Sequence, residues 1–304
     1  MVGITLFVDI VDSCSLGCPT CPVGVEKRRD GNRMSMSLFR EILDKVESEA
    51  KIRKVQLYRW CDPLLHPHLH LFIRECRSRG IRCSTSSALK NFNCDIEEVI
   101  ESRPDEFRIS FSGWKNLIIY QKGNTNKKFF ENFDRICKLP RHKETVWTLY
   151  FHQYKDNLDE TERAGELARE NGLKFVAFPA QYMLYDRIVE GYKEEDKAGL
   201  GLLLDTPEEV ISRLRVQPKE DDYCRQQSKE LVLDSHGRVQ LCQMMYGERF
   251  IVGDFRESEL RKKILNHEFC KGCKVSGVPK YANLCYADPV LHKDPHGEAI
   301  DGKF

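Results

Sequence analysis

Strand-like and helix-like segments alternate through the first two-thirds of this 304-residue chain. The expected strands lie at 4–10, 54–60, 81–86, 106–111, 146–152 and 174–179. The stretches between them, at 38–49, 69–79, 96–102, 127–137 and 159–171, carry apolar residues at helical spacing. This alternation predicts parallel βα units and an α/β fold. A closed barrel of eight units would need more chain before residue 200.

The last third of the chain differs from this pattern. Residues 188–222 are rich in charged residues and contain glycine, as connectors often do. We expect residues 1–200 to form the βα domain and residues 223–304 to form a small cysteine-rich domain. Residues 201–222 would form the connector between these two domains. One connector helix is expected over 207–214, and the segment 231–240 predicts a β-hairpin that turns at 235–237.

Composition excludes several classes of protein. Hydrophobic residues make up 41% of the chain, enough for a sizeable core, and the net charge of +1 implies no polyanion partner such as nucleic acid. No apolar run is long enough to span a membrane, and no signal peptide is visible. Most of the 13 cysteines fall in cluster-like groups, which favours metal clusters over disulfides. We therefore expect a cytoplasmic protein without a membrane partner.

Three cysteines follow the first expected strand with the spacing Cys-x3-Cys-x2-Cys, namely Cys14, Cys18 and Cys21. Closely spaced thiolates suit an iron–sulfur cluster. Because a [4Fe–4S] cube has four irons, three cysteines leave one iron open to bind a small molecule. The alternative is a structural zinc site, which needs a fourth Cys or His close by. The histidines at 66, 68 and 70 are too far along the chain to be taken as that ligand from spacing alone.

This motif resembles that of the radical S-adenosylmethionine (radical SAM) enzymes. The resemblance implies a partial (β/α)6 TIM-like barrel whose open iron chelates the amino and carboxylate groups of SAM. Reductive cleavage of SAM would then give a 5'-deoxyadenosyl radical that abstracts hydrogen from a substrate. The resemblance also implies a one-electron donor such as flavodoxin or ferredoxin.

A second cysteine set lies in the C-terminal part, at Cys224, Cys242, Cys270 and Cys273. The expected hairpin lies between the first two of these cysteines and could bring them together. The arrangement resembles the twitch domain, the short relative of the SPASM domain, in which four cysteines hold one auxiliary [4Fe–4S] cluster with no open iron. A zinc ribbon on the same thiolates is the alternative. A full SPASM domain would need more cysteines, so one auxiliary cluster is expected.

Cys285 is left over from both sets. It could replace one of the four auxiliary ligands, or it could be a plain buried thiol. Radical SAM epimerases suggest a third role, because they combine one auxiliary cluster with a lone cysteine that donates a hydrogen atom to the substrate radical.

The resemblance also indicates residues that bind SAM. Family members carry a Gly-Gly-Glu-Pro-like turn after strand two, where this chain has Trp60-Cys61-Asp62-Pro63, so Asp62 would bind the SAM amino group. From the residues alone, Asp-Pro is an ordinary turn signal. Polar residues facing SAM are expected at the ends of strands three and four, namely Ser84, Ser86, Ser110 and Ser112.

Thr20 stands where the family often has an aromatic residue before the third cysteine. The adenine contact is therefore expected from Phe178 or Tyr182. Substrate-facing groups are expected at the C-terminal ends of the strands. The candidates are His152, Gln181, Tyr182 and Asp186.

The resemblance implies a radical SAM enzyme that oxidises or epimerises a carbohydrate-like small molecule: a sugar, an aminocyclitol or an aminoglycoside. Peptide-modifying relatives usually carry a larger SPASM domain, and many add a leader-binding domain before strand one; we expect neither here. A maturase of a ribosomal peptide is the alternative. A non-catalytic zinc or iron–sulfur protein is the second alternative.

Overall fold

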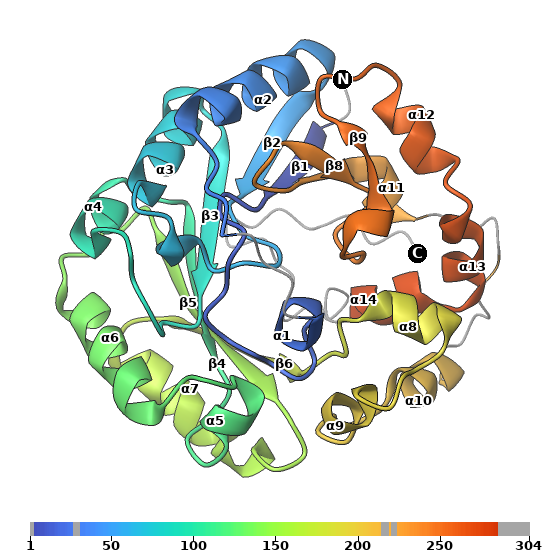
Figure 1. Cartoon of the computed structure of the whole chain (residues 1–304). Coiled ribbons are helices and arrows are strands. Elements are labelled where there is room, and N and C mark those ends of the chain that lie inside the picture. Colours follow the sequence, from blue (N-terminus) through green and yellow to red (C-terminus); the bar gives the residue numbers. More distant parts are fainter. Residues whose placement is uncertain (1–2, 27–30, 214–218, 220–223, 285–304) are drawn as a thin grey trace.

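The computed structural model describes residues 3–26, 31–213, 219 and 224–284 (Figure 1). Its centre is a nine-stranded sheet in the order β6-β5-β4-β3-β2-β1-β7-β8-β9. The six predicted strands are confirmed and run parallel: β1 Gly3–Val8, β2 Lys51–Gln56, β3 Arg82–Ser87, β4 Glu106–Phe111, β5 Val146–Gln153 and β6 Lys174–Pro179. Helices surround these strands in an arc, which gives the expected open barrel of six units.

Strand β2 ends at Gln56, earlier than the predicted end at residue 60. Asp9, which follows β1, explains the difference. Its carboxylate accepts hydrogen bonds from the backbone N–H groups of Arg59 at 2.7 Å and Trp60 at 3.0 Å. Because these groups bond to a side chain, they are not available to a neighbouring strand, and the chain turns there.

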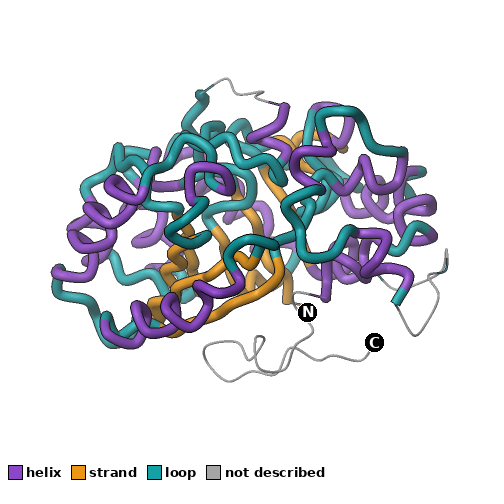
Figure 2. Tube along the Cα trace, turned by 90° about the horizontal axis from the view of Figure 1, so that it is seen from below, coloured by secondary structure: helices purple, strands orange, loops and turns teal. Residues whose placement is uncertain are grey.

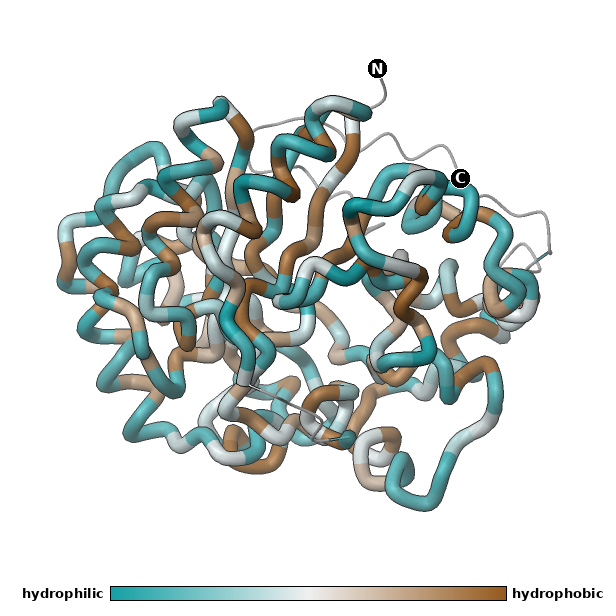
Figure 3. The backbone as a smooth tube through the Cα atoms, turned by 45° about the horizontal axis from the view of Figure 1, so that its top comes forward, coloured by the Kyte–Doolittle hydropathy of each residue, from teal (hydrophilic) through white to brown (hydrophobic). Residues whose placement is uncertain are grey.

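The outer helices also match the predicted stretches: α2 Met36–Glu49, α3 Leu69–Ser78, α4 Ile96–Glu101, α6 Asn126–Lys138 and α7 Thr161–Glu170. Helix α2 begins where the side chain of Ser35 accepts the N–H of Leu38. Apolar and polar residues alternate along these helices (Figure 3), so that each turns an apolar side toward the sheet. In α2 that side consists of Phe39, Ile42, Leu43 and Val46.

The predicted hairpin is formed by β7 Glu230–Leu233 and β8 Arg238–Gln240, and β9 Ile251–Asp254 follows it. Asp234 closes its turn, because Oδ1 accepts the N–H groups of His236 at 3.0 Å and Arg238 at 2.9 Å. Strand β7 also pairs in parallel with β1, with Leu6 opposite Leu231. The hairpin therefore extends the barrel sheet. The segment that carries Cys224 and Cys242 is joined to the barrel through the pairing of β7 with β1.

The remaining helices are short: α1 Pro22–Glu26, α5 Leu117–Tyr120, α8 Tyr185–Glu190, α9 Asp196–Leu200, α10 Pro207–Ser212, α11 Arg225–Lys229, α12 Leu260–Leu265, α13 Phe269–Val275 and α14 Val278–Leu284. Helix α10 is the predicted connector helix and begins with a capping box of Thr206 and Glu209. Helix α14 packs against α8, α10 and α13. Seen from below, strands lie between helices on either side (Figure 2). None of the described helices has both the length and the hydropathy of a membrane span.

Candidate active site

A cavity of about 470 Å³ occupies the interior of the barrel. Every barrel strand contributes a side chain to its wall, for example Phe7, Gln56, Ser86, Ser110, His152 and Phe178. The C-terminal ends of parallel strands are where ligands bind in barrel folds. This cavity is therefore the candidate active site.

The first cysteine set lines this cavity. Cys14, Cys18 and Cys21 lie in the loop between β1 and α1, and all three are half-buried. Neighbouring barrel loops hold this loop in place. Lys90 Nζ donates to the carbonyl of Ser15 at 2.7 Å, and the N–H of Gly17 donates to the carbonyl of Lys122 at 2.8 Å.

The far end of the loop is fixed by the segment after β6 and by α1. The carbonyl of Thr20 accepts the N–H of Met183 at 2.8 Å, and Thr20 itself is buried. Gly24, in α1, packs directly on the loop: a Cβ there would lie 2.2 Å from the carbonyl oxygen of Cys18. Only glycine permits this approach, and the cysteine motif alone gave no indication of it.

Asp62 lies where predicted, on the cavity wall after β2. Its carboxylate accepts the Ser87 hydroxyl at 2.8 Å and the N–H of Leu64 at 3.1 Å. Its own N–H donates to the carbonyl of Ser13, the residue before Cys14, at 3.1 Å. Burial raises the pKa of Asp62 to about 6, although both hydrogen bonds oppose that rise. The carboxylate is therefore charged at neutral pH and lies on the wall that the cysteine loop shares.

The other predicted SAM contacts divide into two groups. Ser86, Ser110, Ser112 and Phe178 line the cavity. Ser84 does not: its side chain is completely buried within the barrel wall. Tyr182 does not line the cavity either: its side chain is fully buried, in the same apolar cluster as Tyr120 and Tyr154. We therefore no longer expect Ser84 or Tyr182 to contact SAM.

An aromatic pair that the sequence reasoning missed lies beside the cysteine loop. Tyr120 and Tyr154 both line the cavity, and their rings stack at 4.0 Å with an angle of 2° between the planes. Burial raises the pKa of Tyr154, and the Cys18 thiol nearby adds to the rise. This stacked pair replaces Tyr182 as the candidate surface for the adenine ring.

Two of the four candidates for substrate contact, His152 and Gln181, line the cavity, and Tyr182 and Asp186 do not. Burial lowers the pKa of His152 to about 4, so its ring is neutral at pH 7. Asp186 instead accepts a hydrogen bond from Arg249 Nη2 at 2.7 Å. That ion pair joins α8 to the segment after β8.

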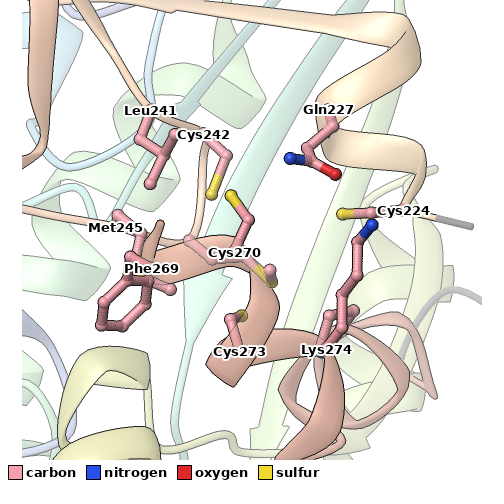
Figure 4. Close-up of a pocket in the computed structure, with 11 residues that line it drawn as sticks. Cys224, Gln227, Leu241, Cys242, Met245, Phe269, Cys270, Cys273 and Lys274 are labelled. Atoms are coloured by element: carbon pink, nitrogen blue, oxygen red, sulfur yellow. The ribbon is translucent and has the colours of Figure 1, made fainter. Parts of the chain in front are cut away.

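The second cysteine set comes together from three parts of the chain. Cys224 precedes α11, Cys242 follows β8, and Cys270 and Cys273 lie on α13. All four line one small pocket, and Figure 4 shows their sulfur atoms directed toward one another. The structure thus brings these four cysteines together in one place.

Burial raises the pKa of all four thiols of the second set, and for Cys242, Cys270 and Cys273 neighbouring cysteines add to the rise. A bound metal group would stabilise the thiolate forms instead. In the described part of the chain, no three His, Cys, Asp or Glu side chains are close enough together to hold one ion. Four cysteines are the donor set both of an iron–sulfur cluster and of a structural zinc site.

The barrel cavity and the pocket of the second cysteine set share one lining side chain, Met244. Gln226 lines the barrel cavity, and its Oε1 accepts a hydrogen bond from Cys224 Sγ at 3.3 Å. The two pockets are therefore adjacent. Cys285 lies outside the described residues.

No family model matches this chain, and no curated protein does. Solved structures with the same fold do exist. BtrN in complex with AdoMet and 2-DOIA has a TM-score of 0.51 at 16% identity, with 92% of this chain and 90% of that chain covered. Native anSMEcpe with bound AdoMet has a TM-score of 0.54 at 14% identity, with 90% and 82% covered.

Streptococcus suis SuiB bound to S-adenosylmethionine has a TM-score of 0.56 at 10% identity, with 91% of this chain but only 66% of that chain covered. These three proteins are radical SAM enzymes of the SPASM or twitch type. The chain shares the fold of these three proteins, a partial α/β barrel as the resemblance implied.

Proposed function

We propose that this chain is a radical SAM enzyme in which Cys14, Cys18 and Cys21 hold a [4Fe–4S] cluster with an open iron. One observation carries the proposal: these three cysteines line the same barrel cavity as Asp62 and the strand ends. When bound, the cluster and SAM would supply an electron and a 5'-deoxyadenosyl radical that abstracts hydrogen from the substrate.

The residues of the chain would bind and orient SAM. The Asp62 carboxylate would accept hydrogen bonds from the SAM amino group, and the stacked rings of Tyr120 and Tyr154 would support the adenine. Ser110 and Ser112 line the wall of the next strand and would bind polar groups of SAM. The cavity encloses these groups and limits the access of water to the reacting atoms.

A carbohydrate-like small molecule remains the proposed substrate. A volume of about 470 Å³ is in the usual range for small-molecule sites. BtrN, which shares the fold, was crystallised with AdoMet and 2-DOIA. The proposed outcome is oxidation or epimerisation of that substrate.

The second cysteine set would hold one auxiliary [4Fe–4S] cluster beside the substrate. Since Met244 alone belongs to the walls of both sites, this cluster could take up an electron from a substrate radical. Flavodoxin or ferredoxin would supply the reducing electron in the cytoplasm. The hydrogen-atom donor role of Cys285 remains part of this proposal for an epimerase.

A peptide maturase is the second candidate. SuiB bound to the precursor peptide SuiA has a TM-score of 0.53, and anSMEcpe with a Cp18Cys peptide has one of 0.51. A peptide substrate would require the cavity to open to a groove on the surface. Co-incubation with short peptides and with sugars would distinguish these two substrate classes.

Anaerobic reconstitution tests the proposal. The protein should bind about eight irons per chain, as expected for two four-iron clusters. It should release 5'-deoxyadenosine from SAM under dithionite. A variant with Cys14, Cys18 and Cys21 all changed to alanine should lose that product and about half the iron. A colourless protein that holds zinc, or wild-type protein that leaves SAM intact, would overturn the assignment.

A further inference from the structure

A lysine lies in the wall of the pocket that the second cysteine set forms. Besides the four cysteines, this wall consists of apolar side chains, Gln227 and Lys274. Lys274 is half-buried, and Figure 4 shows its side chain extending along the pocket toward Cys224. Among the described residues, Lys274 is thus the charged side chain that this wall contains.

Helix α13 determines where Lys274 lies. The helix carries Cys270, Cys273 and Lys274, and residues four positions apart, such as Cys270 and Lys274, lie on the same side of a helix. Helix α13 packs against α8 and α14, and Pro279 of α14 belongs to the pocket wall. Lys271, on the same helix, is exposed and does not line the pocket.

In the described part of the chain, Lys274 has no ion-pair partner, because no Asp or Glu side chain binds its ammonium group. Besides burial, the charge of Glu230 raises the pKa of Cys224, but Glu230 lines the barrel cavity and not this pocket. A half-buried charge is costly unless an opposite charge compensates it. The four cysteines can supply that opposite charge, because they bind metal groups as thiolates.

The charge of Lys274 reaches the sulfur atoms of the pocket. Burial raises the pKa of the Cys224, Cys270 and Cys273 thiols, and the charge of Lys274 opposes each rise. An iron–sulfur cluster held by these cysteines becomes more negative by one charge when it is reduced. A neighbouring cation therefore stabilises the reduced cluster more than the oxidised one, which raises its reduction potential.

We propose that Lys274 raises the reduction potential of the auxiliary cluster, so that this cluster can accept an electron from the substrate radical. The inference rests on the proposed function and concerns its second cysteine set. Lys274 does not line the barrel cavity, so it would act through the cluster, as a positioning residue.

A raised potential favours oxidation over epimerisation. In the oxidation, a substrate radical gives up one electron to the auxiliary cluster and its hydroxyl proton to water, and a carbonyl group remains. An epimerase would instead need the cluster to return an electron to a thiyl radical, which a raised potential opposes. Met244, which lines both pockets, lies between the two partners of this electron transfer.

A redox titration of the reconstituted holoenzyme, followed by electron paramagnetic resonance, tests this proposal without turnover. The auxiliary cluster is recognised as the one whose signal does not change when SAM is added. Lys274→Gln should lower the equilibrium constant for its reduction about tenfold, which is about 59 mV for a one-electron couple. Lys274→Met should have the same effect and serves as the second variant if Lys274→Gln does not fold. Lys274→Arg keeps the charge and should keep the wild-type potential.

Lys271→Gln is the matched control, since it removes a charge from the same helix at an exposed position, where solvent and salt screen it. Its potential should remain that of the wild type. An unchanged potential in uncharged Lys274 variants that still bind about eight irons would overturn the proposal and leave the proposed function intact. An equal shift in Lys274→Arg would also overturn it, because packing rather than charge would then be the cause. Wild-type protein with zinc in the second set would refute the auxiliary cluster itself, and this inference with it.

Discussion

The hydroxyl of Ser87 donates a hydrogen bond to Oδ2 of Asp62 at 2.8 Å, where the loops after β2 and β3 meet. The bond stabilises the charged form of a carboxyl whose pKa burial raises to about 6. In the proposed function the charged form binds the SAM amino group, so the pKa of Asp62 would set the lower pH limit of SAM binding. Ser87 would then influence SAM binding through Asp62.

Ser87→Ala should move that limit upward. A hydrogen bond to a charged group contributes about 1.5–3 kcal/mol, which corresponds to roughly one to two pH units. The affinity for SAM, measured by calorimetry from pH 5 to 9, should therefore begin to fall at a higher pH than in the wild type. Ser78→Ala, whose hydroxyl binds only the carbonyl of Glu75 on the surface, is the control. An identical pH profile for Ser87→Ala would contradict this role of Asp62.

Asp62→Asn should stabilise the fold while it weakens SAM binding. The folded-state pKa of Asp62 is raised from 3.8 to about 6, so the folded state binds the proton more tightly than the unfolded state. Stability is then lost as the pH rises through this range. The neutral amide avoids that loss, worth about 3 kcal/mol at neutral pH. Thermal unfolding at pH 5 and pH 8 should show a gain in melting temperature that is larger at pH 8.

The alternating pattern predicted the barrel strands because each βα unit is a local feature of the sequence. It did not predict where β2 ends, because that depends on the contact between Asp9 and the N–H group of Arg59, 50 residues away. It likewise predicted the hairpin around Asp234 but not that β7 pairs with β1. Pairing between distant strands depends on packing that no local pattern records.

In the candidate site, too, some residues could be identified from local sequence and others could not. Cys14, Cys18 and Cys21 could be identified because their spacing itself carries the chemistry. For the adenine contact, the sequence does not show which aromatic side chains face the cavity. Phe178, Tyr120 and Tyr154 line it, whereas Tyr182, which belongs to the same apolar cluster as the two stacked tyrosines, does not.

Gly24→Ala should disrupt the first cluster. The new Cβ would lie 2.2 Å from the carbonyl oxygen and 2.5 Å from the nitrogen of Cys18, both backbone atoms, so α1 and the cysteine loop must separate. After reconstitution, we expect the iron content to fall by about half and 5'-deoxyadenosine formation to fall at least tenfold. Iron assay and chromatography measure the two effects.

Gly272→Ala provides a matched control beside the other cysteine set. Its Cβ would meet no atom closer than Val189 Cγ1 at 3.7 Å, an ordinary contact, so both clusters should form. Full iron content in the Gly24→Ala protein would show that the close approach of α1 to Cys18 is not needed for the cluster.

Cys270→Ala should remove the auxiliary cluster and leave the first one in place. Cys270 lies on α13, and the wall of the barrel cavity does not include it. The iron content should fall from about eight to about four per chain. Electron paramagnetic resonance should still show the first cluster changing its signal when SAM is added, because Cys14, Cys18 and Cys21 are untouched. Cys137→Ala, a half-buried cysteine on α6 outside both sets, should keep all the iron. Unchanged iron in Cys270→Ala, or bound zinc in its place, would show that the second set holds something other than an iron–sulfur cluster.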